Sequence, residues 1–343
     1  MPYTITLLPF AKQFSCEEDE TILQAALRQG YNLRYGCKHG GCGMCKALIV
    51  EGEVDQEGAS SFALMDFERQ QGFALLCSAY PLSDIAIELW DYEEADLLAT
   101  SPIQDYQAEV ERITVLTHDI RGIHLRLLEP AEINFKAGQY IDLLVPGTNE
   151  WRSYSLANPP SHKNTVELMI KLMAGGLFSS YVAEQLQEGE RLTLQGPYGN
   201  FYLRDTGRAA LFIAGGSGMA PILSLLRDMA ERQTPRPVIY FYGARARRDL
   251  FSLDELYGLE QRLAHFRFIP ALSDPAAADE WSGEVGLITD VVNRQVQSFE
   301  GLEAYMCGPS AMIDAALVLL RRAGMPESDI FYDKFVTKAD TPT

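Results

Sequence analysis

The chain has 343 residues, of which 47% are hydrophobic and 22% charged, a composition typical of a water-soluble protein with two or three domains. Its formal net charge of −18 argues against nucleic acid or an anionic membrane as a partner. The first residues contain no basic segment followed by an apolar core, and no uncharged apolar run of about 18 residues occurs. We therefore expect a cytoplasmic protein that is not inserted in a membrane.

Residues 1–97 predict a compact α+β domain. Polar and apolar side chains alternate over residues 3–8, which indicates a strand, and residues 12–16 return as its hairpin partner. Thr21 opens a helix with apolar positions at helical spacing, and Gly30 closes it. The other expected elements are strands at 46–50 and 85–90 and a short helix at 64–69. This order of elements resembles the ferredoxin β-grasp fold.

Four cysteines form the most informative pattern in this part of the chain. Cys37, Cys42 and Cys45 share one glycine-rich loop, and Cys77 follows at a distance. The C-x4-C-x2-C spacing with a distant fourth Cys is that of a plant-type [2Fe–2S] cluster held by four thiolates. Structural zinc is the alternative, but zinc ribbons usually show two close Cys pairs and this loop contains only one. His39 is expected to be an exposed loop residue rather than a ligand.

A linker is expected at residues 98–106, where Thr100, Ser101 and Pro102 interrupt the pattern. The segment 107–206 is then rich in short strands separated by turn residues, which predicts a small antiparallel β-barrel. The expected elements are strands at 107–117, 120–128, 140–145, 152–156, 166–173 and 191–195, and one helix at 177–186.

Over residues 207–343 strands alternate with helices, which predicts an α/β domain with a parallel sheet. The whole chain is therefore expected to be multidomain, with an α+β ferredoxin domain, an antiparallel β-barrel and an α/β domain. The expected elements of the last domain are strands at 211–214, 238–242, 266–269 and 304–306, and helices at 222–230, 253–263 and 310–322.

The barrel region contains two short motifs. They are the R-x-Y-S pattern of Arg152, Tyr154 and Ser155, and the turn formed by Gly175, Gly176 and Ser179. The first motif alone is weak, because it also fits an ordinary strand. The second precedes a helix, and the free N–H groups at a helix N-terminus suit a pyrophosphate. Ser179 also fits a plain helix N-cap.

Two glycine-containing turns follow strands of the α/β domain. They are Gly215, Gly216, Gly218 and Pro221 after the first strand, and Cys307 and Gly308 after the last. Glycine allows a tight turn and a close approach of the backbone to phosphates. The first turn departs from the common dinucleotide fingerprint, because Pro221 occupies the place of the third glycine. Since α/β sheets bind ligands at the carboxyl ends of their strands, both turns favour a dinucleotide site.

Together these motifs resemble the ferredoxin–NADP reductase superfamily, specifically the reductases with an N-terminal ferredoxin domain that supply electrons to bacterial oxygenases. The resemblance covers nearly the whole chain and implies that the R-x-Y-S pattern binds FAD. It implies that Tyr154 stacks on the flavin ring, that Arg152 contacts the phosphates and that Ser155 lies near the reactive nitrogen. The turn at Gly176 and Ser179 would hold the pyrophosphate.

The resemblance also implies a nicotinamide site at the two glycine turns, with Cys307 lining it rather than acting as a nucleophile. Phe335, in the segment 331–335, would lie against the flavin, although eight residues follow it. Ser155, Cys307 and Phe335 would then surround the reacting atoms. The segment 245–249 offers arginines that suit NADPH and an acid that suits NADH, and the resemblance favours NADH.

The expected electron path runs from NADH through FAD and the [2Fe–2S] cluster to an oxygenase. The aromatic ending resembles the reductases of soluble di-iron monooxygenases that act on hydrocarbons or phenols. Reductases of Rieske dioxygenases and of sugar dehydrases are the alternatives. A redox sensor, from a different class, would need the cluster but neither flavin nor nicotinamide. We expect a monomer whose partner is the hydroxylase component.

The charge is concentrated in the first domain. Residues 1–100 contain 6 Lys and Arg against 16 Asp and Glu, a net charge of −10. An acidic domain of this kind could steer toward a basic docking patch on another redox protein. Solubility is the alternative explanation for the same charge.

Overall fold

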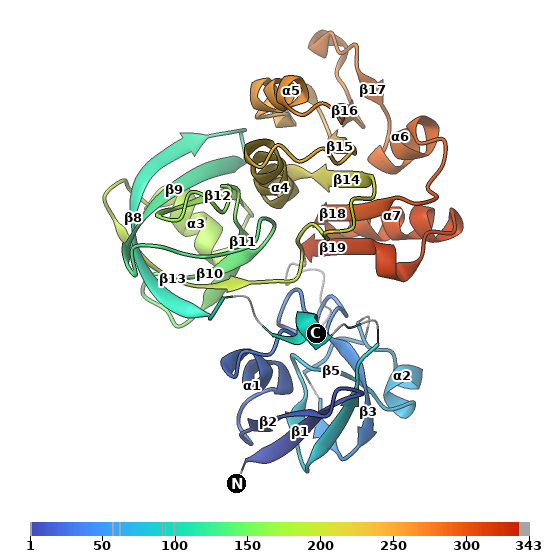
Figure 1. The fold of residues 1–343 in the computed structure, drawn as a ribbon. Helices are drawn as coiled ribbons and strands as arrows, with labels where there is room; N and C mark the ends of the chain where they lie inside the picture. The colour runs from blue at the N-terminus through green and yellow to red at the C-terminus, as the bar shows by residue number, and fades with distance from the viewer. Residues whose placement is uncertain are drawn as a thin grey trace. The chain divides into compact units, whose positions relative to one another are not determined.

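Figure 1 shows the fold in a computed structural model, which describes residues 2–56, 58–61, 63–90, 92, 94–98 and 101–335. The chain divides into two compact units, the first ending at Ile103 and the second spanning residues 104–335. Each unit has its own buried apolar core. Thr100, one of the expected linker residues, lies outside the described part of the chain.

A five-stranded mixed sheet with the strand order β2-β1-β7-β3-β5 forms the first unit. Strand β1 pairs antiparallel with β2 and parallel with β7, as in the predicted ferredoxin fold. Helix α1 starts with a capping box, in which Thr21 and Gln24 each accept a hydrogen bond from the other's backbone N–H. The elements are β1 (Tyr3–Leu8), β2 (Lys12–Cys16), α1 (Ile22–Arg28), β3 (Lys46–Glu51), β4 (Val54–Asp55), α2 (Asp66–Gln70), β5 (Phe73–Leu75), β6 (Tyr80–Pro81), β7 (Ile85–Glu88) and the 3₁₀ turn Glu94–Leu97.

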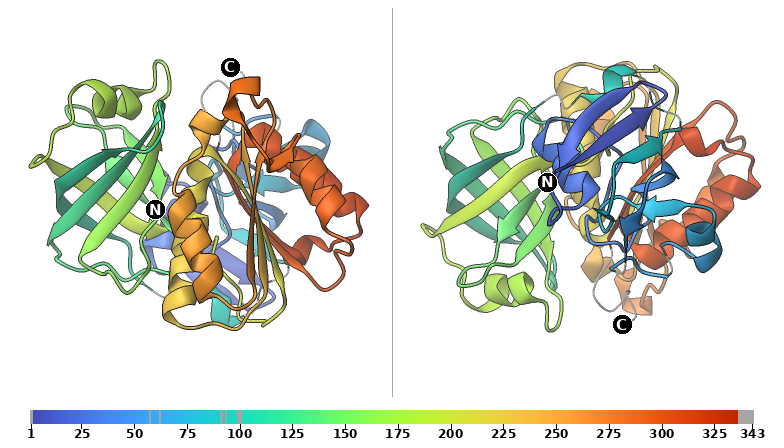
Figure 2. Two further views of the ribbon diagram at one scale, coloured as in Figure 1. Left: turned by 90° about the horizontal axis from the view of Figure 1, so that it is seen from above. Right: turned by 90° about the horizontal axis from the view of Figure 1, so that it is seen from below.

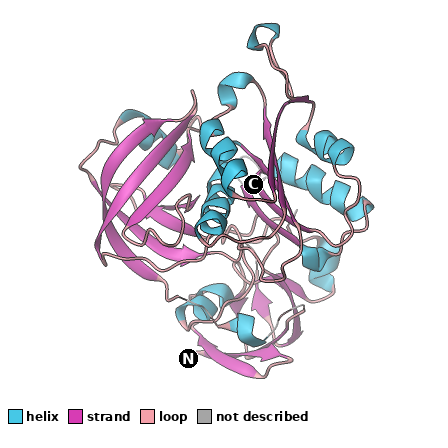
Figure 3. Ribbon diagram, turned by 45° about the horizontal axis from the view of Figure 1, so that its top comes forward, coloured by secondary structure: helices cyan, strands magenta, loops and turns pink. Residues whose placement is uncertain are grey.

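Six antiparallel strands in the order β11-β10-β13-β8-β9-β12 form the first part of the second unit. A bridge between Leu156 and Leu168 joins the two edges of this sheet, which closes it into the predicted barrel (Figure 3). Helix α3 contributes Phe178 and Val182 to the core of the barrel. The elements are β8 (Gln104–Val115), β9 (Ile120–Glu129), β10 (Tyr140–Leu144), β11 (Trp151–Ser155), β12 (Thr165–Lys171), α3 (Leu177–Glu184) and β13 (Arg191–Tyr198).

The barrel begins earlier than expected. Gln104 and Asp105 pair with Gly196 and Gln195 in the β8–β13 ladder, although both were expected in the linker. The linker signal came from local turn residues, whereas strand formation here depends on a partner strand far along the chain. Residues 104–106 are therefore strand residues.

A six-stranded parallel sheet in the order β17-β16-β15-β14-β18-β19 forms the rest of the second unit. Helices α4 and α5 cover one face and α6 and α7 the other (Figure 2). The chain order reverses between β14 and β18, and α/β sheets bind ligands at the carboxyl ends of strands at such a point. The elements are β14 (Ala210–Gly215), α4 (Met219–Glu231), β15 (Val238–Ala244), α5 (Leu253–Arg262), β16 (Phe266–Leu272), β17 (Glu284–Val285), α6 (Ile288–Gln295), β18 (Glu303–Pro309), α7 (Ser310–Arg322) and β19 (Ile330–Phe335), with 3₁₀ turns at Gly216–Gly218, Arg247–Asp249, Ala277–Asp279 and Glu327–Asp329.

Three elements of this sheet domain, α6, β17 and β19, were not expected. The aromatic segment that ends at Phe335 forms β19, which pairs parallel with β18. Its partner strand β18 is separated from it by helix α7, so no local sequence pattern predicts β19. Within the described residues, no helix is both long and apolar enough to span a membrane.

Candidate functional site

The four cysteines of the first unit come together as two pairs. The Sγ atoms of Cys45 and Cys77 are 3.2 Å apart, and the Cys37 and Cys42 thiols interact with each other. Cys45 and Cys77 are buried, with 3% and 8% of their surface exposed. Cys77 follows β5 in the sequence, and β5 pairs with β3, which begins directly after Cys45. This pairing brings Cys77 to the loop.

Backbone N–H groups of the loop point at the sulfurs. Gly40 N–H donates to Cys77 Sγ at 3.2 Å, and Gly41 N–H donates to Cys37 Sγ at 3.3 Å. Gly40 has a φ of +74°, and a Cβ there would lie 2.7 Å from Ser78 Oγ. Only glycine fits this position, and the donors favour the thiolate form of the ligands.

Within each cysteine pair, the pKa of one thiol is lowered and the pKa of the other is raised. Interaction with Cys42 and His39 lowers the pKa of Cys37, and interaction with Cys45 lowers the pKa of Cys77. The partner thiols behave oppositely, because interaction with the neighbouring sulfur and burial raise the pKa of Cys42 and Cys45. Positive metal ions would therefore be needed to stabilise all four thiolates together.

The paired arrangement fits two metal ions better than one. A single tetrahedral zinc would hold all four sulfurs around one point, whereas the thiols here form two pairs. A [2Fe–2S] cluster instead places two cysteines on each iron, which matches the observed pairs. His39 is exposed, and its Nδ1 lies 2.6 Å from Cys37 O, so it is engaged with the loop backbone. The four cysteines thus fit the cluster predicted from their spacing.

In the second unit, the R-x-Y-S residues lie on β11, an edge strand of the barrel sheet. Tyr154 is half-buried, its ring centroid is 5.5 Å from that of Phe178, and burial raises its pKa. Arg152 donates from Nη1 to Glu150 Oε2 at 2.9 Å. Ser155 is 7% exposed and ends the strand. A half-exposed aromatic ring beside a cation is a suitable surface for a flavin and its phosphates.

The glycine turn before α3 excludes the alternative in which Ser179 is only the helix N-cap. Gly176, not Ser179, is the N-cap, and a Cβ on Gly176 would lie 2.4 Å from Ser179 Oγ. The Ser179 hydroxyl accepts from Met173 N–H and donates to Met173 O, both at 3.1 Å. Ser179 therefore shapes the turn with its side chain. The first N–H groups of α3 have no partner within the helix and fit a pyrophosphate.

The two predicted glycine turns of the α/β domain meet backbone to backbone. A Cβ on Gly218 would lie 2.3 Å from Cys307 O, and one on Gly308 would lie 2.8 Å from Gly215 O. Gly216 has a φ of +56°, which favours glycine. Both turns stand at the carboxyl ends of neighbouring strands, β14 and β18. This is the switch point of the sheet, where a dinucleotide is expected.

Three further predicted residues lie around these turns. Pro221 is in the first turn of α4, where its missing N–H leaves no helical bond unmade. Cys307 is fully buried, and burial raises the pKa of its thiol well above the usual range, which favours the neutral form. Phe335 ends β19 opposite Pro309, and its carbonyl accepts from Ser310 Oγ at 2.7 Å.

Sequence reasoning missed two acids near the arginines of the segment 245–249. Arg245 Nε lies 3.5 Å from Asp274 Oδ2, and Arg247 Nη1 donates to the carbonyl of Asp279 at 2.5 Å. Both acids follow β16, which lies beside β15 in parallel register. No local motif connects them to the arginines, because only the sheet brings the two loops together.

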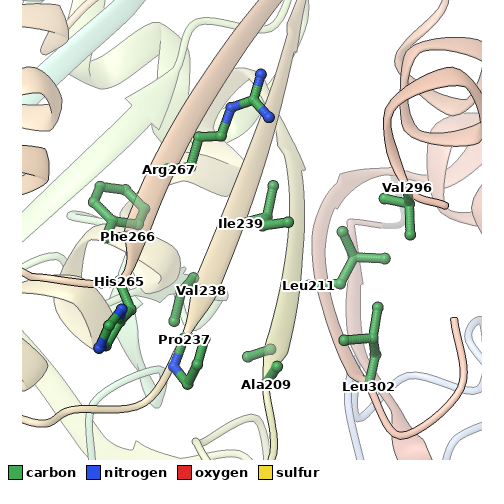
Figure 4. Close-up of a pocket in the computed structure, with 11 residues that line it drawn as sticks. Ala209, Leu211, Pro237, Val238, Ile239, His265, Phe266, Arg267, Val296 and Leu302 are labelled. Atoms are coloured by element: carbon green, nitrogen blue, oxygen red, sulfur yellow. The ribbon is translucent and has the colours of Figure 1, made fainter. Parts of the chain in front are cut away.

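A cavity of about 370 Å³ lies at the amino-terminal ends of the strands of the parallel sheet (Figure 4). Its lining comes from the starts of β14, β15 and β16 and from Val296 and Leu302. The glycine turns are at the other end of the same parallel strands. The cavity is therefore separate from the dinucleotide site.

Comparisons with known proteins agree with the predicted fold class and cofactors. Family models match in order along the chain: "2Fe-2S iron-sulfur cluster binding domain" at residues 5–82, "Oxidoreductase FAD-binding domain" at 107–202 and "Oxidoreductase NAD-binding domain" at 212–317. The fold and the family models thus define an iron–sulfur flavoprotein oxidoreductase that uses a nicotinamide dinucleotide, with the cofactors [2Fe–2S], FAD and NAD.

Proteins with similar sequences and structures show which family of such oxidoreductases the chain belongs to. The chain is 42% identical over 98% of its length to the propane 2-monooxygenase reductase component of Mycolicibacterium smegmatis, covering 97% of that protein. It is 42% identical over 99% of its length to the phenol 2-monooxygenase reductase component of Pseudomonas sp., covering 96% of that protein. A solved structure, the cytochrome P450 reductase GcoB of Amycolatopsis, matches with a TM-score of 0.85 and 32% identity, covering 98% of this chain and 99% of that one. The chain belongs to the family of reductase components of multicomponent monooxygenases.

Proposed function

We propose that this protein passes electrons from NADH to the hydroxylase component of a soluble di-iron monooxygenase of the hydrocarbon or phenol class. When bound, FAD would supply two-electron hydride chemistry and the [2Fe–2S] cluster would supply one-electron transfer. The observation that carries the proposal is the two-by-two pairing of the cysteine thiols, in a chain that also has a dinucleotide turn. We infer three functional domains, a cluster domain over 1–97, a flavin barrel ending near residue 206 and a nicotinamide domain after it.

The residues of the first unit would hold the cluster. Cys37 and Cys42 would bind one iron, and Cys45 and Cys77 the other. Gly40 and Gly41 would donate their N–H groups to the ligand sulfurs, which stabilises negative charge on the centre. Burial of Cys45 and Cys77 would keep water away from one side of it.

The residues of the second unit would hold and orient the other two cofactors. Tyr154 would support the flavin ring, Arg152 would bind its phosphates, and the start of α3 after Gly175 would bind the pyrophosphate. Ser155 would lie near the reactive nitrogen. Phe335 would cover the flavin from the edge of the parallel sheet.

The glycine turns would bind the nicotinamide nucleotide. Gly215, Gly216 and Gly218 would let the backbone approach the phosphates, and Gly308 with Cys307 would form the neighbouring wall. A neutral, buried Cys307 thiol supplies packing rather than a charge. The family resemblance favours NADH over NADPH, and Asp274, whose carboxylate lies 3.5 Å from Arg245 Nε, places an acid beside the arginines of this segment.

The acceptor assignment rests on the relatives rather than on the site. The two relatives with 42% identity over nearly the whole chain are named as reductase components of propane and phenol monooxygenases. A Rieske dioxygenase is the second candidate, because a ferredoxin reductase of carbazole 1,9a-dioxygenase matches over 98% of this chain at 31% identity. A cytoplasmic monomer is the expected form, since four thiolates suit a reducing compartment.

Anaerobically purified protein tests the proposal. Two irons, two sulfides and one FAD are expected per chain, and NADH should reduce both centres faster than NADPH does. Electrons should then pass to a purified phenol hydroxylase component and sustain substrate oxidation. Zinc in place of iron and sulfide, or an absence of flavin, would refute the proposal. Transfer to a Rieske oxygenase but not to a di-iron hydroxylase would favour the second candidate.

A further inference from the structure

Helix α4 connects the dinucleotide turn to the flavin strand. The helix starts directly after Gly218, and two of its side chains contact the barrel. Ser224 Oγ donates to the carbonyl of Asn158 at 2.7 Å, and Arg227 Nη1 donates to the carbonyl of Ala157 at 2.9 Å. Ala157 and Asn158 follow the R-x-Y-S strand almost immediately. One helix therefore touches both halves of the proposed hydride-transfer site.

The barrel side of this contact is held rigidly. Asn158 is fully buried, and its Oδ1 accepts from Glu167 N–H at 3.0 Å while its Nδ2 donates to Thr165 O at 2.9 Å. Ala157 N–H donates to Glu167 O at 2.8 Å. Ala157 and Asn158, which accept the hydrogen bonds from α4, are thus bonded to β12. A movement of α4 relative to the barrel would therefore have to break hydrogen bonds.

On the helix side of the contact, ion pairs hold the Arg227 side chain in place. The Arg227 guanidinium donates from Nη1 to Glu167 Oε2 at 2.7 Å, and from Nε and Nη2 to the two carboxylate oxygens of Glu255 on α5, at 2.6 and 3.0 Å. Only 22% of the Arg227 side chain is exposed. A two-pronged pair with a carboxylate defines direction as well as distance, so Arg227 has one preferred position between the barrel and α5.

We propose that Arg227 and Ser224 are positioning residues that set the distance between the nicotinamide turn and the flavin strand. This inference rests on the proposed function. With a helical rise of 1.5 Å per residue, Gly218 lies about 9 Å along the axis from Ser224 and about 14 Å from Arg227. A shift of about 1 Å at the reacting atoms is enough to cost about 100-fold in rate. Neither residue needs to touch either cofactor to control that distance.

The test is single-turnover reduction of FAD by NADH in the full-length holoprotein. Arg227→Met removes the guanidinium and keeps an unbranched stem. It should lower the rate at saturating NADH by about 10- to 100-fold. The NADH dissociation constant should change by less than about threefold, because the contacts of Arg227 are with the barrel and α5. Arg227→Lys should recover part of the rate, since it restores the charge but not the two-pronged geometry.

An isotope effect separates positioning from a purely structural role, and amide exchange shows whether the contact between α4 and the barrel has loosened. NADH deuterated at the transferred position should show a larger isotope effect in R227M, because hydride transfer becomes more limiting. Amide exchange in segments 157–168 and 215–231 should rise in the same variant, independently of turnover. Arg232→Met is the matched control, because Arg232 lies at the end of α4, is 68% exposed and pairs only with Asp228 among its described ion pairs. It should behave as wild type.

A wild-type reduction rate in R227M with a lowered melting temperature would overturn the inference, since the contact would then only stabilise the fold. Loss of flavin, or a rise in the NADH dissociation constant that accounts for the whole effect, would also overturn it. Should R227M fail to fold, Ser224→Ala removes one buried hydrogen bond and no charge. It should slow reduction by about three- to tenfold, and an unchanged rate would contradict the inference. A wild-type protein that NADH does not reduce would instead refute the proposed function.

Discussion

Replacing Gly218 by alanine tests how the two glycine turns build the nicotinamide site. The backbone of Gly218 has φ −62° and ψ −8°, which alanine adopts freely, so any effect must come from the added Cβ. That atom would lie 2.3 Å from Cys307 O, 2.6 Å from Cys307 C and 2.8 Å from Gly308 Cα. All three are backbone atoms, so no side-chain rotation can relieve the contact.

The size of the effect follows from these distances. Opening the 2.3 Å contact to an ordinary van der Waals separation of 3.4 Å moves the two turns apart by about 1 Å. Overpacking of this kind lowers the free energy of unfolding by about 1–3 kcal/mol. A displacement of about 1 Å at a substrate-positioning element costs about 100-fold in rate. We therefore expect kcat/KM for NADH to fall about 100-fold in Gly218→Ala.

The assay is NADH-dependent reduction of ferricyanide, with FAD content and thermal unfolding measured on the same samples. FAD content should stay normal, because the flavin motif is on the barrel. Gly258→Ala is the control: it lies inside α5, and a Cβ there would have no atom within 4 Å. It should gain about 0.5–1 kcal/mol of stability through helix propensity, with unchanged activity. A kcat/KM within twofold of wild type in Gly218→Ala would refute the reasoning, since the turns would then tolerate separation.

Three further predictions address the other parts of the molecule. Cys77→Ser removes the ligand that comes from outside the loop, so electron transfer to cytochrome c and to the hydroxylase should be lost while NADH reduces FAD normally; equal loss of both would show that the two centres do not act in series. If the net charge of −10 over residues 1–100 steers docking, transfer to the hydroxylase should slow as salt rises toward 0.15 M, where the screening length is about 8 Å, and FAD reduction should not change. Asp66 is exposed on α2 and lies close to Cys77 in the sequence, whereas Asp19 is remote from the cysteine loop, so Asp66→Lys should weaken this salt dependence more than Asp19→Lys. Identical salt curves for the wild type and both variants would mean that the acidic residues serve solubility. Glu303 is fully buried; burial tends to raise its pKa, but hydrogen bonds from Tyr305, Arg236, Thr206 and Arg208 lower it overall. Its stabilising effect is therefore present above the unfolded-state pKa of about 4.3 and is lost as the pH falls through the lower folded-state pKa. Glu303→Gln should lower the free energy of unfolding at pH 7 by about 3–5 kcal/mol and flatten its acid dependence, whereas Glu327→Gln, in an exposed pair with Arg321, should change it by less than about 1 kcal/mol; similar values for both variants would contradict the assignment.

Much of the architecture was readable from the sequence because it depends on local patterns. The change from short strands to alternating strands and helices predicted the barrel and the parallel sheet, since side-chain period reports burial within each element. The spacing of Cys37, Cys42 and Cys45 predicted the cluster, because one loop of fixed length must place three ligands. The glycines after β14 marked a turn that few other residues permit.

What sequence patterns missed depended on partners far away in the chain. The strands β17 and β19 and the first residues of β8 form because a neighbouring strand offers an edge, and strand formation responds to that neighbour more than to local propensity. The helix α6 was missed for a related reason. It has no side-chain cap, and its apolar residues Val291 and Val292 are explained only by the sheet face that they cover.

The same limit applies to the site. The cysteine spacing predicted four ligands, but only the tertiary structure decided that they pair as Cys37 with Cys42 and Cys45 with Cys77. Gly218 looked like a phosphate-binding glycine, and its contact with Cys307 showed that it is also required for packing. Arg227 carried no motif at all. It gained its place between the flavin strand and α5 because folding brings residues 157, 167, 227 and 255 to one point, and proximity created by long-range packing leaves no periodic trace in the sequence.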